Sequence, residues 1–240
     1  MEGEILRGLG RLRLDGDAPP WVRVASRTDA GVSAVGNALT LSSRITGRPL
    51  LRALNGIAPE IRFTRTREVP EGFNPRHATE RRYTYFELEG PVHRTAWEAG
   101  ARLFEGRVDT RTFGRGVRTD APVWREVTSV EVHEEADGLR VEIRGRSFAW
   151  GMVRKMISAL RRLDRGEIGM EELRLAIDGR RRLTLPLAEP EALVLAEVSY
   201  PDRWEVEEIE PARHQKAYIA EELQRGRRRR WVLDRMAGVP

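Results

Sequence analysis

A short apolar run, residues 21–25, is followed by Ser26-Arg27-Thr28-Asp29-Ala30-Gly31, which places a carboxylate beside a guanidinium where a strand should give way to a turn. Two interpretations fit these residues. An aspartate close before a glycine is a common turn residue, and Arg27 could simply be solvated. Alternatively, Asp29 is an ionised nucleophile or base on a rigid loop, kept charged by Arg27. The loop alone leaves both interpretations open.

A second stretch has side chains that could contact nucleic-acid bases. Residues 81–88 predict an aromatic-rich strand that begins with two arginines. Tyr83 and Tyr85 share one face of this strand, and core packing or cross-strand pairing is the ordinary explanation for them. Interleaved arginines and aromatic rings are also what a base-stacking platform needs.

The charge balance favours a polyanionic partner. The chain has 42 basic and 37 acidic residues, and only Lys155 and Lys216 are lysines, so 40 of the basic residues are arginine. Arginine binds phosphate through two parallel hydrogen bonds and stacks on bases, which suits RNA. Codon bias of a GC-rich genome explains part of the excess, but it does not set where the arginines fall.

The composition excludes several other kinds of site. The chain has no cysteine, so disulfides, thiolate zinc sites and thiol nucleophiles are excluded, and the four histidines show no ligand spacing. We therefore expect no metal site at these residues. No apolar run is long enough to span a bilayer and no signal peptide is evident. A cytoplasmic protein without membrane contact is the resulting expectation.

Hydrophobic periodicity predicts the elements that position these residues. Arg154 falls within an expected helix among the apolar residues Trp150, Val153, Ile157 and Leu160, so its charge should be partly buried and partnered. The expected helices cover residues 3–14, 48–57, 147–160 and 169–177, with one or two more within 90–116. The expected strands cover residues 21–25, 32–41, 61–69, 81–88, 124–134, 139–143 and 192–200, with a tight turn at Asp137-Gly138.

This order of elements predicts an α+β protein built from two halves. Residues 1–90 form the N-terminal α+β half with the Asp29 loop, and residues 91–200 form the C-terminal α+β half. Residues 201–240 form a charged helical tail that includes Arg227-Arg228-Arg229-Arg230. A solvated helix is the default for such a tail. Contact with RNA phosphates is the alternative.

Four stretches together resemble one family. Arg27-Thr28-Asp29-Ala30-Gly31-Val32 resembles the signature of the tRNA pseudouridine synthase A family, in which the aspartate is catalytic. The other three agree with the family in order and approximate spacing, over about residues 1 to 200. They are residues 51–55 with Phe73-Asn74-Pro75-Arg76 and Arg81-Arg82-Tyr83-Thr84-Tyr85, residues 148–154 with a buried arginine, and residues 186–200 with Leu193 and a closing Tyr200.

The resemblance implies a pseudouridine synthase fold, in which two α/β halves with joined antiparallel sheets surround a central cleft. Members typically act as homodimers on tRNA. They isomerise uridines at positions 38–40 of the anticodon stem-loop without metal or cofactor. The resemblance also implies that the family begins with a strand that this chain lacks.

The resemblance implies a role for each matching residue. Asp29 would attack the ribose or the uracil ring, or otherwise assist glycosidic cleavage, and a carboxylate can act in turn as nucleophile, leaving group and base. Tyr83 would stack on the flipped uracil and could handle a proton, while Arg27 would hold the flipped nucleotide or its phosphate. Arg154 would be the buried partner of Asp29 and keep it anionic.

The resemblance implies two further substrate-binding residues, and three residues of this chain differ from those common in the family. Arg76 belongs to the second matching stretch. Leu193, together with Leu195 on the same strand face, would line the pocket and keep water out. Ser33 and Gly151 stand where many members have histidine, and Ala192 replaces a common glycine.

Two other functions remain open at this stage. The first is a tRNA-binding protein of the same fold whose activity is impaired because the N-terminal strand is missing. The second is a basic ribosome-associated domain in which the Asp29 loop is only structural.

Overall fold

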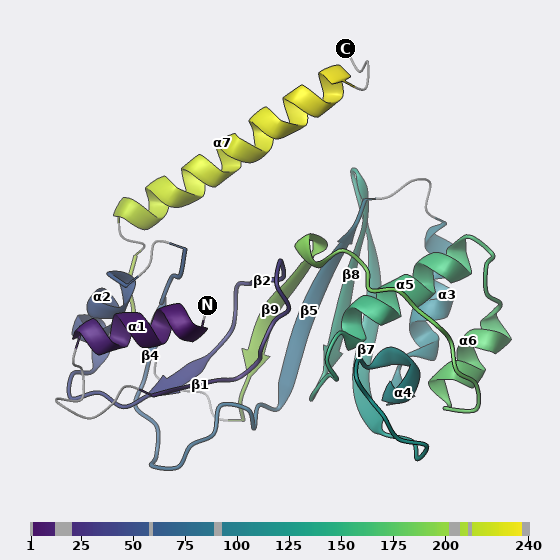
Figure 1. Cartoon of the computed structure of the whole chain (residues 1–240), viewed down its shortest axis with the longest axis horizontal. Helices are drawn as coiled ribbons and strands as arrows, with labels where there is room; N and C mark the ends of the chain where they lie inside the picture. Colours follow the sequence, from purple (N-terminus) through teal and green to yellow (C-terminus); the bar gives the residue numbers. More distant parts are fainter. Residues whose placement is uncertain are drawn as a thin grey trace. The chain divides into compact units, whose positions relative to one another are not determined.

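The computed structural model describes residues 2–12, 21–57, 60–88, 93–201, 207–210 and 213–236. The chain forms two compact units (Figure 1). Unit 1 contains Met1–Arg23, Leu39–Asn74 and Asp202–Pro240, and unit 2 contains Val24–Ala38 and Pro75–Pro201. Each unit is therefore assembled from separate parts of the chain.

Unit 2 is built on a six-stranded sheet in the order β2-β9-β5-β8-β7-β6. All neighbouring strands are antiparallel except β2 and β9, which are parallel. The strands are β2 (Ser33–Ala34), β5 (Glu80–Glu87), β6 (Gly106–Asp109), β7 (Trp124–Glu135), β8 (Gly138–Gly145) and β9 (Leu193–Ser199).

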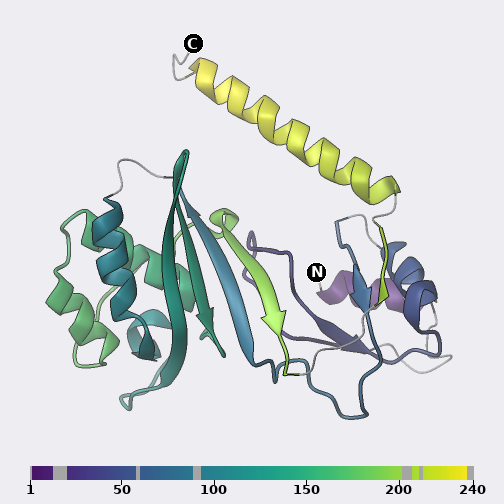
Figure 2. The same ribbon diagram turned by 180° about the vertical axis from the view of Figure 1, so that it is seen from behind.

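Helices cover one face of this sheet (Figures 1 and 2). They are α3 (Arg94–Leu103), α4 (Thr110–Phe113), α5 (Met152–Asp164) and α6 (Met170–Ile177), with a short 3-10 turn, η1 (Pro190–Ala192), before β9. The core between helices and sheet includes the fully buried Trp97, Tyr85, Phe104, Phe113 and Leu160. Burial of this apolar surface is the main force that holds unit 2 together.

The inward face of β5 combines polar and aromatic side chains. Arg81, Tyr83, Tyr85 and Glu87 alternate along the strand and are all buried. The pairing of β5 with β9 shifts register between Arg82 and Tyr83, which marks a bulge. A bulge bends the strand locally and redirects side chains, and its extra residue here is Ala196 of β9, whose carbonyl oxygen lies beside Gly36.

Among its described residues, unit 1 has a smaller core cluster, formed by Ile5, Leu9, Val22, Leu50 and Leu54. Its elements are α1 (Glu2–Leu12), β3 (Leu39–Leu41), α2 (Gly47–Asn55), β4 (Arg65–Thr66), β10 (Glu207–Glu208) and α7 (Arg213–Met236). β4 pairs with β10, and β3 pairs with β1 (Val22–Val24). None of the helices in the described residues is long and apolar enough to cross a membrane.

The predicted α+β class is confirmed, and most predicted elements are present, but three predictions of elements were wrong. The helix expected over 147–160 begins only at Met152, because Gly151 has a left-handed backbone, φ +70°, that interrupts it. The strand expected over 32–41 is divided into β2 and β3, which belong to different sheets. The strand expected over 61–69 is reduced to β4, Arg65–Thr66.

Candidate active site

The Asp29 loop lies between β1 and β2 and is held against β9. The backbone N–H of Val32 donates to the carbonyl of Asp29 at 3.1 Å, which closes a turn, and Val35 donates to the carbonyl of Leu195 at 2.9 Å. Gly31 has φ +88°, and a Cβ there would lie 2.9 Å from Cγ of Pro190. A glycine is therefore required where the loop approaches η1.

Both carboxylate oxygens of Asp29 accept a hydrogen bond. Trp150 Nε1 donates to Oδ1 at 2.7 Å, and Arg154 Nη1 donates to Oδ2 at 2.7 Å. Arg154 is fixed in turn because its Nε donates to the carbonyl of Ala188 at 2.6 Å. The Asp29 side chain is 18% exposed. The carboxylate is thus oriented from two sides, accessible, and still has lone pairs for a substrate, because each oxygen can accept two hydrogen bonds.

Sequence reasoning missed the position of Trp150. It was expected in the core of a helix, but it precedes α5 and is 57% exposed. The guanidinium of Arg115 lies 4.3 Å from the centre of its ring. The left-handed Gly151 places Trp150 outside the helical register, and its position directly before a glycine was the available signal.

Sequence reasoning also left Arg81 without a role. Its Nε donates to the hydroxyl of Ser26 at 2.7 Å, and its Nη2 donates to the carbonyls of Ala25 at 3.1 Å and Arg76 at 2.9 Å. Burial lowers the pKa of Arg81. This buried guanidinium ties the start of the Asp29 loop to β5, and the alternation already seen for Tyr83 and Tyr85 could have indicated that Arg81 points inward.

Tyr83 lies close to Asp29. The residue is only 8% exposed and its ring packs edge-on against Phe148, with centroids 5.3 Å apart. Burial raises the pKa of Tyr83, and the charge of Asp29 raises it further, whereas Arg81 and a hydrogen bond with Ser26 lower it. Its phenol is therefore protonated at neutral pH and available as a hydrogen-bond donor.

The remaining predicted site residues lie on the same unit in different settings. Arg27 and Arg76 are exposed. Leu193 is buried at the start of β9, where it pairs with Tyr85. The structure thus brings Asp29, Arg154 and Tyr83 together, with two exposed arginines on the segments that lead into the site.

One group of side chains among the described residues has the spacing of a metal site. Glu131, His133 and Glu142 place their ligand atoms within 4.8 Å of one another on β7 and β8. Glu142 is already paired with three arginines of β5 and β8. We therefore interpret the group as part of an ion-pair cluster and assign it no metal.

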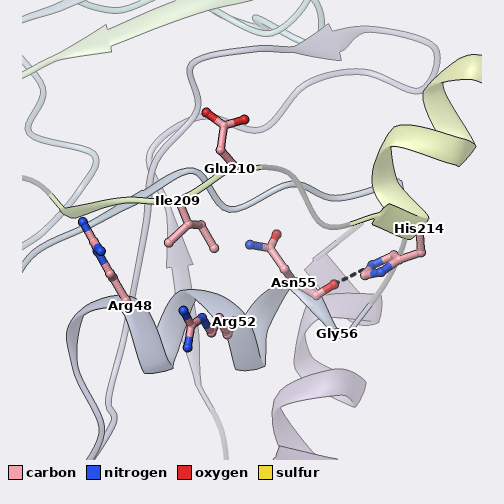
Figure 3. A pocket seen from close by; sticks show the side chains of 7 residues that line it. All are labelled: Arg48, Arg52, Asn55, Gly56, Ile209, Glu210 and His214. Carbon is pink, nitrogen blue, oxygen red and sulfur yellow. Dashed lines mark hydrogen bonds between the residues drawn. The ribbon is translucent and has the colours of Figure 1, made fainter.

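A pocket of about 630 Å³ lies in unit 1 (Figure 3). It is lined by Arg48, Arg52, Asn55, Gly56, Ile209, Glu210 and His214. His214 Nε2 lies 2.9 Å from the backbone oxygen of Asn55. None of the predicted site residues lines this pocket, so it is distinct from the Asp29 site.

An α+β unit with an oriented, accessible carboxylate beside aromatic rings and arginines is suited to an enzyme that acts on a nucleotide base. The family model for tRNA pseudouridine synthase matches residues 101–201. Three archaeal relatives named tRNA pseudouridine synthase A, from Thermococcus sibiricus, Thermococcus kodakarensis and Methanothermobacter thermautotrophicus, are 35%, 34% and 30% identical to this chain. These matches cover 83%, 84% and 83% of the chain and 76%, 76% and 72% of the relatives.

The chain therefore belongs to the tRNA pseudouridine synthase A family and is an isomerase that forms pseudouridine in tRNA. A chain from the crystal structure of a Cbf5-Nop10-Gar1 complex is similar at a TM-score of 0.38 and 15% identity. That match covers 65% of this chain and 38% of the other.

Proposed function

We propose that this enzyme isomerises uridines at positions 38–40 of the tRNA anticodon stem-loop, with Asp29 as the catalytic nucleophile or base. The main support for the role of Asp29 is its carboxylate, which Trp150 and Arg154 orient through one hydrogen bond each at 2.7 Å. Pre-orientation of a reacting group lowers the entropic part of the barrier.

The reaction needs no redox partner, because uridine and pseudouridine are isomers. The bond between ribose C1′ and uracil N1 breaks, a bond between C1′ and C5 forms, and the proton on C5 leaves while N1 gains one. Asp29 can attack C1′ or the uracil ring and later accept the C5 proton. Tyr83 is protonated and so cannot accept that proton without first losing its own, which leaves the carboxylate as the base in this proposal.

The other residues would bind the flipped nucleotide. A uridine must leave its stack to react, and the enzyme has to replace the lost stacking. We assign contact with the uracil to Tyr83, the apolar wall of the pocket to Leu193, and phosphate contact to the exposed Arg27 and Arg76. Arg154 is assigned the positioning of Asp29. A homodimer is proposed on the family resemblance alone, and a cytoplasmic location on the composition of the sequence.

The test is single-turnover tritium release from tRNA labelled at uracil C5. We expect Asp29→Asn and Asp29→Ala to lower the release rate on the order of a thousandfold or more, because a nucleophile or base is removed. Binding of tRNA should change only a few-fold. Asp178→Asn, an exposed aspartate at the end of α6, is the control and should react at the wild-type rate.

Three outcomes would change the proposal. Equally low release from wild type and Asp29→Ala would favour an inactive tRNA-binding protein. Normal release from Asp29→Asn would remove Asp29 from the chemistry. Release from tRNA whose label is confined to uridines outside positions 38–40 would overturn the anticodon stem-loop assignment.

A further inference from the structure

The last three turns of α7 carry a concentrated positive charge that the Asp29 site does not use. Residues 225–236 contain six arginines and one aspartate, an excess of five positive charges. The formal net charge of the whole chain is +5. The rest of the sequence is therefore balanced, and a general arginine bias does not explain why the excess lies in one half of one helix.

The helix is anchored in unit 1 at its first turn. Gln215 is 1% exposed, and its Nε2 donates to Oδ1 of Asn55 at 2.7 Å and to the carbonyl of Ile61 at 2.9 Å. From Lys216 onward the described side chains are exposed or half-buried. With 24 residues the helix is about 36 Å long. Most of α7 therefore extends away from α1 and α2 as an arm (Figures 1 and 2).

Two of the three acids of α7, Glu221 and Glu222, lie before this arm, so one aspartate faces six arginines within it. Arg225 pairs with Glu221 at 3.4 Å and with Glu222 at 2.6 Å. Within the described residues, Arg227 and Arg229 have no carboxylate within ion-pair distance. Arginines three and four positions apart repel one another along a helix. The arm is thus a surface that an added polyanion would stabilise.

We propose that the second half of α7 binds the phosphate backbone of the substrate tRNA, at nucleotides other than the reacting uridine. The inference rests on the proposed function, since it takes the same tRNA as ligand. Guanidinium groups bind phosphate oxygens in pairs, and arginine-rich segments are common in RNA recognition. A second copy of this chain would present the same arginines and be repelled, so self-association through this half is disfavoured.

The test compares the full-length protein with a variant that carries Arg227→Gln, Arg228→Gln, Arg229→Gln and Arg230→Gln. Glutamine has nearly the helix propensity of arginine, so α7 should persist, which circular dichroism checks. The matched control replaces the same four arginines by lysine and keeps the charge. The probe is an unmodified tRNA transcript, and affinity is measured over a series of salt concentrations.

We expect the glutamine variant to bind tRNA roughly tenfold or more weakly at low salt. The slope of log affinity against log salt should fall by about 3, because each phosphate contact contributes about 0.7 to 0.9 to that slope. The lysine control should keep most of the slope. The tritium-release rate at saturating protein should not change, because the proposal assigns the arm to nucleotides other than the reacting uridine.

Equal slopes for wild type and the glutamine variant would overturn the proposal. If the glutamine variant differed from wild type only in its sedimentation mass, the proposal would be overturned in favour of dimerisation. If it differed only in binding to phosphatidylserine vesicles, the proposal would be overturned in favour of a membrane surface. Failure of the proposed function is a separate result. Tritium release would then be absent from every protein, while the difference in salt slope would remain.

Discussion

At the scale of single residues, Asp29 obtains its hydrogen-bond donors from far along the chain. Trp150 and Arg154 lie 121 and 125 residues away, and both donate at 2.7 Å. Arg27, only two residues away, is exposed on the loop. The orientation of the carboxylate therefore depends on where α5 begins, which Gly151 determines.

The indole N–H of Trp150 should contribute to the activity separately from its aromatic surface. Trp150→Phe removes the donor to Asp29 and keeps a ring that Arg115 can cover. A hydrogen bond to a charged group is worth about 1.5–3 kcal/mol, so we expect the single-turnover rate to fall by about 10- to 100-fold. Trp124→Phe, in a strand that contacts Arg107, is the control. A wild-type rate for Trp150→Phe would show that Arg154 alone orients Asp29.

The alkaline titration of Tyr83 should follow from its burial. Its pKa is raised above the ordinary 10.0, so the native state keeps a proton that the unfolded chain has lost. The stabilisation by neutral Tyr83 is therefore complete below pH 10 and is lost as the pH rises through the native pKa. Ultraviolet absorbance follows the formation of tyrosinate as the pH rises, and the urea-unfolded chain gives the reference titration. We expect Tyr83→Phe to remove one transition that occurs at higher pH than in the unfolded chain. A Tyr83 that titrates with the unfolded chain would contradict the buried position.

At the scale of elements, α5 holds the segment before β9 at two points. Arg154 donates to the carbonyl of Ala188, and Arg161, two turns further on, donates through Nη1 to Glu189 Oε2 at 2.6 Å. Burial alone would raise the pKa of Glu189, but hydrogen bonds from its own backbone and from Arg161 lower it. The turn η1 follows this segment directly, and its Pro190 lies against Gly31. By holding the segment, α5 therefore also supports the Asp29 loop.

Arg161 should be far more important for stability than its neighbour Arg162. Arg161 is 13% exposed and donates through Nε to Glu87, which is 1% exposed, at 2.5 Å. Removing one partner of a buried ion pair costs about 3–5 kcal/mol, so Arg161→Met should lower the free energy of unfolding by that amount. Arg162→Met breaks a pair with Glu167 near the surface and a hydrogen bond to the Thr184 carbonyl, and should cost about 1 kcal/mol. Urea unfolding measures the free energies of both variants, provided that the dependence of the unfolding free energy on urea concentration is unchanged.

The Arg161 prediction has a second check. If the loss comes from the unpaired Glu87 carboxylate, Arg161→Met combined with Glu87→Gln should regain part of the stability. A double variant less stable than Arg161→Met alone would place the effect elsewhere in the network with Tyr85 and Glu189.

At the scale of the whole molecule, the two units differ in the size of their cores. Among the described residues, the core cluster of unit 1 has five buried apolar side chains, whereas that of unit 2 extends over the helices and strands that surround Trp97 and Ile143. Local stability follows the amount of buried apolar contact. We therefore expect amide hydrogen exchange to be faster in α1 and α2 than in β5 and β8.

A substitution in the core of unit 1 should test this difference in local stability. Leu54→Ala removes a side chain buried in α2 and should cost about 2–5 kcal/mol, which raises exchange in α1 and α2. Arg52→Ala, at an exposed position of the same helix, is the control and should leave exchange nearly unchanged. Equal exchange for the two variants would contradict the core assigned to unit 1.

The sequence by itself determined most of the elements and the family. Period-2 alternation identified β5, and the Asp137-Gly138 turn identified the hairpin of β7 and β8. Local motifs around Asp29, Tyr83 and Arg154 were enough to indicate a pseudouridine synthase, because such motifs depend on residues close together in the chain. Arg154, expected from its apolar neighbours to be partly buried and partnered, has a side chain that is 12% exposed and pairs with Asp29.

Only the tertiary structure decided which side chains meet. The contacts of Asp29 with Trp150, of Arg81 with Ser26 and of Arg161 with Glu87 and Glu189 join segments that no local pattern relates. The same holds for the division of residues 32–41 between two sheets, because strand pairing depends on partners distant in sequence. Propensity and periodicity are local quantities, whereas an active site is assembled by long-range packing.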